Sequence, residues 1–216
     1  MKVPDDLIAV FATLATPTIA NALDDVGFAG IMTGLGQVVP GTRLAGRAVT
    51  VREVTGARGD FTSDDFKVGH MIDAAGAGDV LVVDNGGHCV STWGGLATYA
   101  AKVKGVGGLV VDGGVRDREE MLEHRLPVFA RHMTPLTGRT RIKITSIGET
   151  VSCGGVVVQP GDVIVADGSG VTCIPARHAA KVAELAARYA SDDKLAEAEL
   201  ARGLSFREAM ARFKRI

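Results

Sequence analysis

Two stretches in the middle of the chain decide the fold: GDVLVVDNGG at residues 78–87 and GLVVDGGVRD at residues 108–117. Each begins as a run of β-branched and aliphatic residues, which is typical of a buried strand, and ends in glycines, which are typical of a loop. The two stretches therefore predict strands at residues 79–84 and 108–112, each followed by a glycine-rich loop.

The sequence around these two strands predicts helices and a further strand. Residues 92–104 predict a helix capped by Ser91, and residues 117–125 predict another helix. PVFA at residues 127–130 predicts a third strand. Strands that alternate with helices in this order are typical of a parallel sheet with right-handed crossovers.

The amino-terminal part predicts two short helices and a strand. The helices are expected at residues 5–14 and 18–26, with Thr16 as the N-cap and Pro17 in the first turn of the second helix. Residues 47–54, RAVTVREV, alternate between apolar and polar side chains as a strand does.

The remaining segments complete the predicted architecture. A helix is expected at residues 65–75, and the closely spaced β segments after residue 140 predict antiparallel hairpins. Residues 175–213 are rich in Ala, Glu, Arg and Lys and predict helix. We therefore expect an α/β protein with a mixed sheet, helices outside it and a helical C-terminal tail.

The composition is that of an ordinary globular protein. The 216 residues are 46% hydrophobic and 23% charged, which suits one domain with a substantial core, or one domain plus a helical appendage. The net charge of −1 lacks the basic surplus of nucleic-acid-binding proteins, so no nucleic-acid partner is expected. The first residues contain no long apolar run, so we expect no signal peptide and no membrane span, with a cytoplasmic location as the default.

The predicted sheet has one edge at which a ligand is expected. The loops that lead from parallel strands into helices emerge at the same edge, where ligands usually bind. Residues 85–87 and 113–117 form two such loops, and the helix after Gly94-Gly95-Leu96 begins at that edge. Because the first turn of a helix favours negative charge, we expect an anion, an arginine and a carboxylate in one crevice.

Arg116 and Asp117 are the predicted catalytic residues of this crevice. The guanidinium of Arg116 matches a carboxylate, and the carboxylate of Asp117 is a hard oxygen donor suited to Mg²⁺ or Mn²⁺. Glu120 lies three residues after Asp117 on the same helix face and can orient metal-bound water. The alternative is that Arg116 and Asp117 form only surface and capping interactions.

Other polar residues are weaker candidates. A lone loop histidine such as His88 is more often a polar lining residue than a ligand, and Cys89 has no motif for nucleophilic catalysis. The remaining histidines, His70 among them, show no metal-ligand spacing. An acidic cluster in a predicted loop is expected to be solvated; it comprises Asp60, Asp64 and Asp65.

GDVLVVDNGG, followed by STWGGLATYAAKVKGVGGLVVDGGVRD, resembles the RraA-like family over roughly residues 15–175. That family includes the 4-hydroxy-4-methyl-2-oxoglutarate / 4-carboxy-4-hydroxy-2-oxoadipate aldolases and the ribonuclease E regulator RraA. Gly95, twenty further residues, Arg116-Asp117, two residues and then Glu120 match the aldolase-type signature. The regulators typically carry Asp in place of this glycine and often lack the later acid, so the resemblance favours the enzyme.

The resemblance implies a fold and an assembly. The fold would be an α-β-β-α sandwich similar to a swivelling phosphohistidine-type domain. Residues 1–175 would form the RraA-like aldolase domain, with residues 176–216 as a helical extension packed on the same domain or on a neighbouring subunit. The protomers would assemble as homotrimers or hexamers with sites between subunits, and a neighbour's Glu197 or Glu199 is a candidate to complete each site.

The resemblance also implies roles for the site residues. Asp117 would bind the divalent metal, Mg²⁺ or Mn²⁺, with waters completing the coordination shell. Arg116 would bind the pyruvoyl end of a small 2-oxo acid. Backbone N–H groups near the start of the following helix would help to hold the substrate, and the residues concerned are Gly94, Gly95 and Leu96.

The implied activity is a class II, metal-dependent pyruvate aldolase. Retro-aldol cleavage of a 4-hydroxy-2-oxo acid leaves the enolate of pyruvate, as does decarboxylation of oxaloacetate, and a cation with a guanidinium stabilises that charge. Lys102 and Lys104 lie at the far end of their predicted helix, which argues against a Schiff base. The alternatives are an RraA-type regulator of ribonuclease E and a methyltransferase, although the chain start lacks a glycine-rich strand–loop–helix for S-adenosylmethionine.

Overall fold

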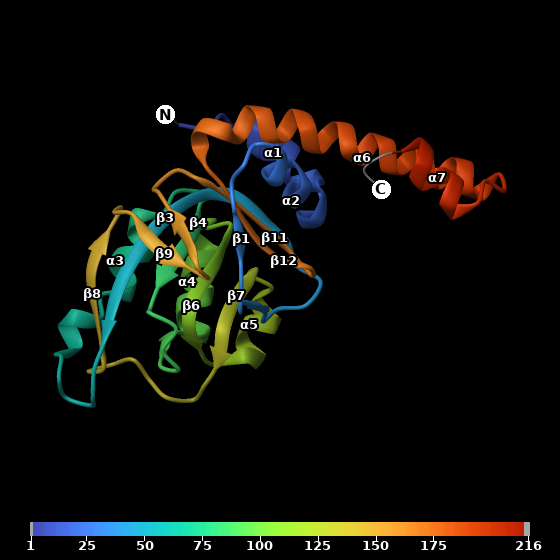
Figure 1. The fold of residues 1–216 in the computed structure, drawn as a ribbon. Helices are drawn as coiled ribbons and strands as arrows, with labels where there is room; N and C mark the ends of the chain where they lie inside the picture. The colour runs from blue at the N-terminus through green and yellow to red at the C-terminus, as the bar shows by residue number, and fades with distance from the viewer. Residues whose placement is uncertain (1, 214–216) are drawn as a thin grey trace.

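The centre of the protein is a sheet of four parallel strands in the order β3–β4–β6–β7 (Figure 1). The computed structural model describes residues 2–213. Both β4 and β6 are almost completely buried because other layers cover both faces of the sheet, which explains their continuous apolar sequence. The strand bounds are β3 Leu44–Thr55, β4 Val80–Asp84, β6 Gly108–Val115 and β7 Val128–Met133.

One face of this sheet is covered by helices. Alternate residues of the central strands, such as Leu81, Val83 and Leu109, point to this side and share a core with Met71 and Met121 of the helices. The crossover helices therefore lie where the predicted strand–helix alternation requires them. Their bounds are η1 Ser63–Phe66, α3 Val68–Ala74, α4 Gly95–Lys104 and α5 Arg118–His124.

The other face of the sheet packs against β structure. Val80, Val82 and Val110 share a second core with residues of the hairpin β9–β10 and of β11 and β12. β11, β12 and β1 continue the sheet beyond β3 in antiparallel fashion, β8 pairs with β3, and β2 pairs with β7. The bounds are β1 Ile31–Met32, β2 Gly36–Gln37, β8 Ile142–Ile147, β9 Val151–Cys153, β10 Val156–Val158, β11 Val163–Asp167 and β12 Gly170–Ile174.

A second helical layer closes the fold. α1 Asp5–Thr13, α2 Thr16–Asp25 and the first half of α6 Ala179–Ala201 share a third core with β11 and β12. The layer order is thus α-β-β-α, and the predicted fold class is confirmed. η2 Ala176–His178 precedes α6, whose far end projects beyond the body together with α7 Phe206–Arg212 (Figure 1). The proposed division of the chain at residue 175 stays a prediction.

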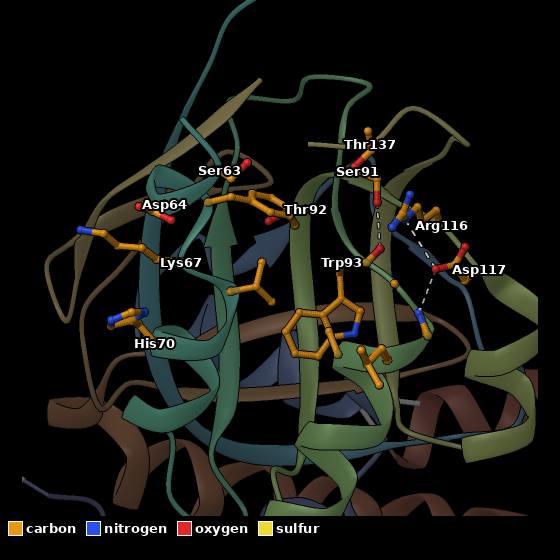
Figure 2. Close-up of a pocket in the computed structure, with 16 residues that line it drawn as sticks. Ser63, Asp64, Lys67, His70, Ser91, Thr92, Trp93, Arg116, Asp117 and Thr137 are labelled. Atoms are coloured by element: carbon orange, nitrogen blue, oxygen red, sulfur yellow. Dashed lines mark hydrogen bonds and ion pairs between the residues drawn. The ribbon is translucent and has the colours of Figure 1, made fainter. Parts of the chain in front are cut away.

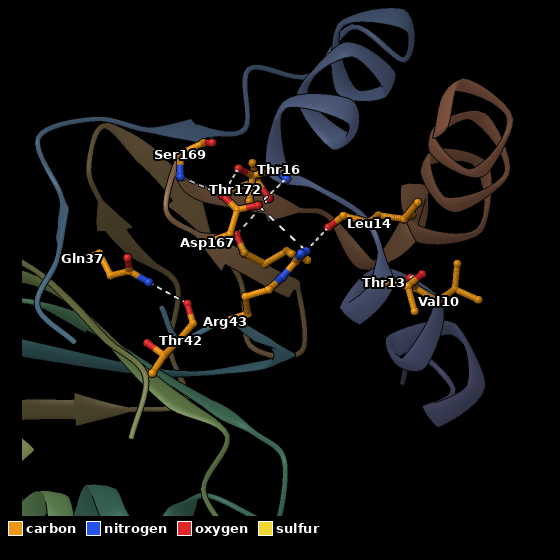
Figure 3. Close-up of polar contacts among 11 residues, drawn as sticks. Val10, Thr13, Leu14, Thr16, Gln37, Thr42, Arg43, Asp167, Ser169 and Thr172 are labelled. Atoms are coloured by element: carbon orange, nitrogen blue, oxygen red, sulfur yellow. Dashed lines mark hydrogen bonds and ion pairs between the residues drawn. The ribbon is translucent and has the colours of Figure 1, made fainter. Parts of the chain in front are cut away.

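Thr16 does not cap α2, contrary to the prediction. Ala15 precedes the helix, while the N–H and hydroxyl of Thr16 donate to the carboxylate of Asp167 at 2.9 and 2.7 Å. Arg43 lies on the same carboxylate at 3.9 Å (Figure 3). A buried carboxylate at the end of β11 draws both donors, so Thr16 joins the outer helices to the sheet. Pro17 lies in the first turn as predicted.

The hydrophobic residues of α1 and α2 pack into the core that these helices share with α6, β11 and β12. Among residues 2–213 no single helix is long and apolar enough to cross a bilayer, and α1 with α2 meets that length and composition test only as a pair bent by 116°.

Candidate active site

A short strand absent from the sequence prediction builds the candidate site. Ser91–Trp93 form β5, which pairs in parallel with the end of β6, so Ser91 is not a helix cap and α4 begins only at Gly95. The N–H of Arg116 donates to the carbonyl of Trp93 at 3.0 Å. This pairing brings the start of α4 beside the residues that follow β6.

β6 is also longer than predicted, because its glycines belong to the strand and not to a loop. A Cβ at Gly113 would lie 2.7 Å from the Cβ of Asn85, and one at Gly114 would lie 2.8 Å from the carbonyl oxygen of Val90. Only glycine permits this close approach. The turn into α5 therefore begins at Arg116.

Buried hydrogen bonds fix the first turn of α4. Trp93 donates from Nε1 to the hydroxyl of Thr98 at 2.8 Å, and that hydroxyl donates to the carbonyl of Gly94 at 3.0 Å. Since no side chain caps this helix, its first N–H groups are open to neighbouring carboxylates or to a ligand. The N–H of Gly95 donates to Oδ2 of Asp117 at 3.1 Å.

Asp117 occupies a backbone conformation that side chains rarely adopt. Its φ is 59° and its ψ is 49°, in the left-handed region, at the N-cap position of α5. Strain of this kind is kept where the surroundings enforce it, often at functional sites. The conformation places Oδ2 between the N–H of Gly95 and Nε of Arg116, which is 3.5 Å away.

Close packing requires glycine at two positions where the start of α4 meets Arg116, Asp117 and Glu120, a region that we call the corner. A Cβ at Gly94 would lie 2.4 Å from Oδ2 of Asp117, and a Cβ at Gly95 would lie 1.7 Å from Oε2 of Glu120. Glu120 thus rests against the start of α4. Gly95, Asp117 and Glu120, which are separated along the sequence, therefore contact one another in the fold.

These residues open onto a cavity of about 670 Å³. Figure 2 shows Arg116 and Asp117 on one side of it and Asp64, Lys67 and His70 on the other. The predicted residues Gly94, Gly95, Leu96, Arg116 and Asp117 all line the cavity, together with Ser63, Phe66, Val68, Ser91, Thr92, Trp93, Ala97 and Thr137. Glu120 is not one of the lining residues and lies behind Gly95.

One expectation about the cavity walls is wrong. None of residues 85–87 lines the cavity; Asn85 and Gly86 line a separate depression of about 330 Å³ with His88. Asp64 and His70 also line the cavity, and Asp64 is exposed, as expected for the acidic cluster. Asp64 lies in η1, on the connection from β3 to α3, and His70 lies in the first turn of α3. This connection starts at the same edge of the sheet as the other strand-to-helix loops. That rule, applied to the strand at residues 47–54, is the signal that identifies them.

Glu53 is a buried acid that the sequence did not single out. It is 6% exposed, and the hydroxyl of Thr92, a cavity residue, donates to its Oε1. Burial raises the pKa of Glu53 to about 8, opposed by the Thr92 hydrogen bond and assisted by the charge of Asp84. Its other oxygen, Oε2, has no hydrogen-bond partner among residues 2–213. Burial therefore favours the neutral form of Glu53, which is linked to the cavity through Thr92.

The donor set at Asp117 suits only one type of metal site. No group of three or more His, Cys, Asp or Glu residues in the described part of the chain is arranged around a metal position. A single carboxylate fits Mg²⁺ or Mn²⁺, which keep several waters in their coordination shells. The site is compatible with the predicted ion on that basis.

The C-terminal acids lie far along the projecting helices. Glu199 accepts from Arg202 at 2.7 Å and from Arg212 at 2.8 Å, so it joins α6 to α7. Whether Glu197 or Glu199 reaches a neighbouring site stays a prediction.

The sequence of this chain matches a known protein family. Residues 16–173 match the model of the RraA-like family, described as Aldolase/RraA. A protein of Halalkalibacterium halodurans, provisionally named a 4-hydroxy-4-methyl-2-oxoglutarate aldolase, is 33% identical over 89% of this chain and 87% of its own. The 4-hydroxy-4-methyl-2-oxoglutarate aldolase of Thermus thermophilus is 34% identical over 62% of this chain and 76% of its own.

Structural comparison agrees. RraAS2 of Streptomyces coelicolor, described as an unusual member of the RNase ES inhibitor RraA protein family, superposes with a TM-score of 0.83 at 23% identity. The match covers 92% of this chain and all of that one, and it shows a shared fold. The family model matches most of the length of this chain, and the Gly95–Arg116–Asp117 corner is in place. The chain therefore belongs to the Aldolase/RraA family.

Proposed function

We propose that this protein is a divalent-metal-dependent lyase that cleaves 4-hydroxy-2-oxo acids of the 4-hydroxy-4-methyl-2-oxoglutarate type to pyruvate by a retro-aldol reaction. The same site would decarboxylate oxaloacetate, because both reactions leave the enolate of pyruvate. The observation that carries the proposal is the pairing of Arg116 and Asp117 at the first turn of α4, inside a cavity of about 670 Å³. The names of the relatives agree with it.

Arg116 is positioned to bind the 2-oxo acid end of the substrate. Nε faces Asp117 at 3.5 Å, and no carbonyl or carboxylate of residues 2–213 accepts from its two terminal amino groups. Those groups are a fork that matches a carboxylate in a bidentate manner. The N–H groups of Leu96 and Ala97, in the first turn of α4, add donors at the same wall.

Asp117 would hold the metal ion. The N–H of Gly95 binds one of its oxygens and so fixes the orientation of the carboxylate. When bound there, a divalent cation supplies positive charge that stabilises the developing enolate. Glu120 packs against Gly95 and supports this arrangement from behind.

The opposite wall offers groups that can move protons. His70 lines the cavity across from Arg116 (Figure 2), and an imidazole is a common general base. The hydroxyl of Thr92 donates to the buried Glu53, so its oxygen can accept a hydrogen bond from a substrate hydroxyl. Cleavage requires removal of the 4-hydroxyl proton, and this wall is where that proton would be taken up.

The assembly would be a homotrimer or hexamer. Leu96, Tyr99 and Val103 form an apolar face on α4 next to the cavity and are 81%, 52% and 70% exposed. Their spacing places them on one side of the helix. An exposed apolar face of this kind marks an interaction surface, and a second copy of the chain is its proposed occupant. The projecting end of α6 and α7 would contact a neighbouring subunit (Figure 1).

Pyruvate release tests the proposal directly. We expect metal-dependent pyruvate release from 4-hydroxy-4-methyl-2-oxoglutarate and from oxaloacetate, and none with EDTA. Turnover of oxaloacetate alone would keep the chemistry of the site but contradict the proposed hydroxy-acid substrate.

The alternative within the same family is a protein-interaction role, as an RraA-type regulator of ribonuclease E. The family model covers both kinds of protein. Gly95 and Glu120, which pack against each other, favour the enzyme. The regulatory role predicts tight binding to ribonuclease E that survives the substitution Arg116→Ala.

A further inference from the structure

A second cavity adjoins the candidate active site and is lined by three arginines. Its volume is about 570 Å³, and its arginines are Arg58, Arg139 and Arg141. It shares two lining residues, Ser63 and Thr137, with the active-site cavity. We call it the arginine cavity.

The two shared residues hold two of the arginines. Nε of Arg139 donates to the hydroxyl of Ser63 at 2.9 Å, and its backbone N–H donates to the hydroxyl of Thr137 at 3.2 Å. Nη1 of Arg141 donates to the carbonyl of Thr137 at 3.2 Å. Figure 2 shows Thr137 beside Ser91, on the side of the cavity that carries Arg116. Thr137 therefore lines both cavities and contacts two of the three arginines.

Backbone hydrogen bonds hold the two chain segments that form the arginine cavity. The N–H groups of Gly59 and Phe61 donate to the carbonyl of Thr140 at 3.1 and 3.3 Å, and the N–H of Gly56 donates to the carbonyl of Arg141 at 2.8 Å. These bonds hold the loop that carries Arg58 against the chain segment that carries Arg139 and Arg141. Thr140 has a φ of 64°, a left-handed conformation that costs energy for a β-branched residue and is typical of ligand-binding loops.

The positive charge of the arginine cavity lacks a counterion among the residues that the structure describes. No carboxylate of residues 2–213 forms an ion pair with its three arginines. Asp60 accepts from the N–H of Ala57, and Asp65 is engaged by Thr62 and Lys143, while Asp64 faces the active-site cavity. Three guanidinium groups without a carboxylate partner attract an anion, and the fork of a guanidinium suits a carboxylate.

We propose that the arginine cavity binds the second carboxylate of a dicarboxylic 2-oxo acid whose 2-oxo acid end lies at Arg116. This inference rests on the proposed function and assigns to Arg139 and Arg141 the selection of dicarboxylic over monocarboxylic substrates. Thr137, shared by both cavities, marks the path along which a single ligand spans them.

Calorimetric titration with two ligands of equal chain length tests the inference. 2-Oxoglutarate and 2-oxopentanoate share the 2-oxo acid end, differ in the second carboxylate, and lack the hydroxyl that cleavage requires. We expect the metal-loaded protein to bind 2-oxoglutarate more tightly at low salt. Arg139→Gln and Arg141→Gln should each weaken that binding about tenfold and leave 2-oxopentanoate binding unchanged. Arg177→Gln, at an exposed arginine of η2, is the control for net charge and should change neither.

Three results would overturn the inference. The first is equal affinity of the parent protein for the two ligands. The second is a variant that loses affinity for both ligands by the same factor. The third is inorganic phosphate that binds the arginines as tightly as 2-oxoglutarate does. Because neither ligand is cleaved, this outcome is independent of catalysis. Discrimination without pyruvate release would contradict only the lyase, and pyruvate release without discrimination would contradict only the role of the arginine cavity.

Discussion

The N–H of Gly95 donates a hydrogen bond to Oδ2 of Asp117 at 3.1 Å, although 21 residues separate the two in the sequence. This bond aims the start of α4 at the carboxylate that is proposed to hold the metal. Its donor and its acceptor are both held in place by neighbours, Gly95 by Glu120 and Asp117 by Arg116.

Gly95→Ala should distort this corner. The new Cβ would lie 1.7 Å from Oε2 and 2.7 Å from Cβ of Glu120, so one element must move. Overpacking of this kind costs about 1–3 kcal/mol. We expect pyruvate release to fall strongly, measured as kcat/KM, with a modest drop in the midpoint of thermal unfolding.

Gly69→Ala is the matched control, because Gly69 lies in α3 and a Cβ there meets no atom within 4 Å. It should leave activity unchanged. Glu120→Ala should restore part of the activity of Gly95→Ala by removing the carboxylate from the clash. Full activity of Gly95→Ala alone would show that the corner does not matter for catalysis.

Glu53 makes stability depend on pH. Its pKa is about 8 when folded, against 4.5 for an ordinary glutamate, so the folded state binds the proton more tightly. The associated stability is complete below pH 4.5 and is lost as the pH rises towards 8, by on the order of a few kcal/mol. Glu53→Gln should therefore melt at a higher temperature than the parent at pH 9, and with a smaller difference at pH 5. Glu149→Gln, at an exposed site, is the control, and a difference that is the same at both pH values would contradict the assignment.

Arg116→Lys should distinguish the effect of positive charge on substrate binding from the effect of the guanidinium geometry. The lysine keeps the positive charge but lacks the planar fork and the Nε that faces Asp117 at 3.5 Å. We expect KM for the 2-oxo acid to rise about tenfold or more, with a smaller effect on thermal unfolding. Arg118→Lys, at the exposed neighbouring residue, should behave like the parent. An unchanged KM in Arg116→Lys would mean that the substrate carboxylate binds elsewhere.

Val103→Glu should dissociate the proposed assembly. Val103 is 70% exposed on the apolar face of α4 with Leu96 and Tyr99, and a carboxylate buried in that interface would be costly. Sedimentation velocity should show the parent as a trimer or hexamer and the variant as smaller species. Lys102→Glu, at an exposed neighbour, is the control. A monomeric parent, or a variant as large as the parent, would contradict the role of this face.

The central parallel strands could be predicted because burial on both faces leaves continuous apolar runs, as in VLVVD at 80–84. The corner residues could be predicted because the loops after parallel strands share one edge. The sequence did not reveal β5, since Ser91–Trp93 are too short for a periodic pattern and pair only with the distant end of β6. The sequence predicts a cap at Thr16 because its true partner, Asp167, lies 151 residues away and leaves no local signal.

The rest of the cavity depends on tertiary contacts in the same way. His70 and Asp64 have no spacing that points to a site, and they reach it only because the connection from β3 to α3 folds over the same edge. Glu53 reads as an ordinary polar position of an alternating strand, and its burial follows from β8 pairing with β3. Such residues are found by placing every strand-to-helix connection at one edge before weighing its side chains.

The most direct test of the central claim is Asp117→Asn, compared with the parent for Mn²⁺ affinity and for pyruvate release. Asparagine tolerates the left-handed backbone at this position, so the fold should be kept. We expect Mn²⁺ binding to weaken at least about tenfold and pyruvate release to fall at least about a hundredfold, with thermal unfolding close to that of the parent. A variant that binds Mn²⁺ and releases pyruvate as the parent does would contradict the account.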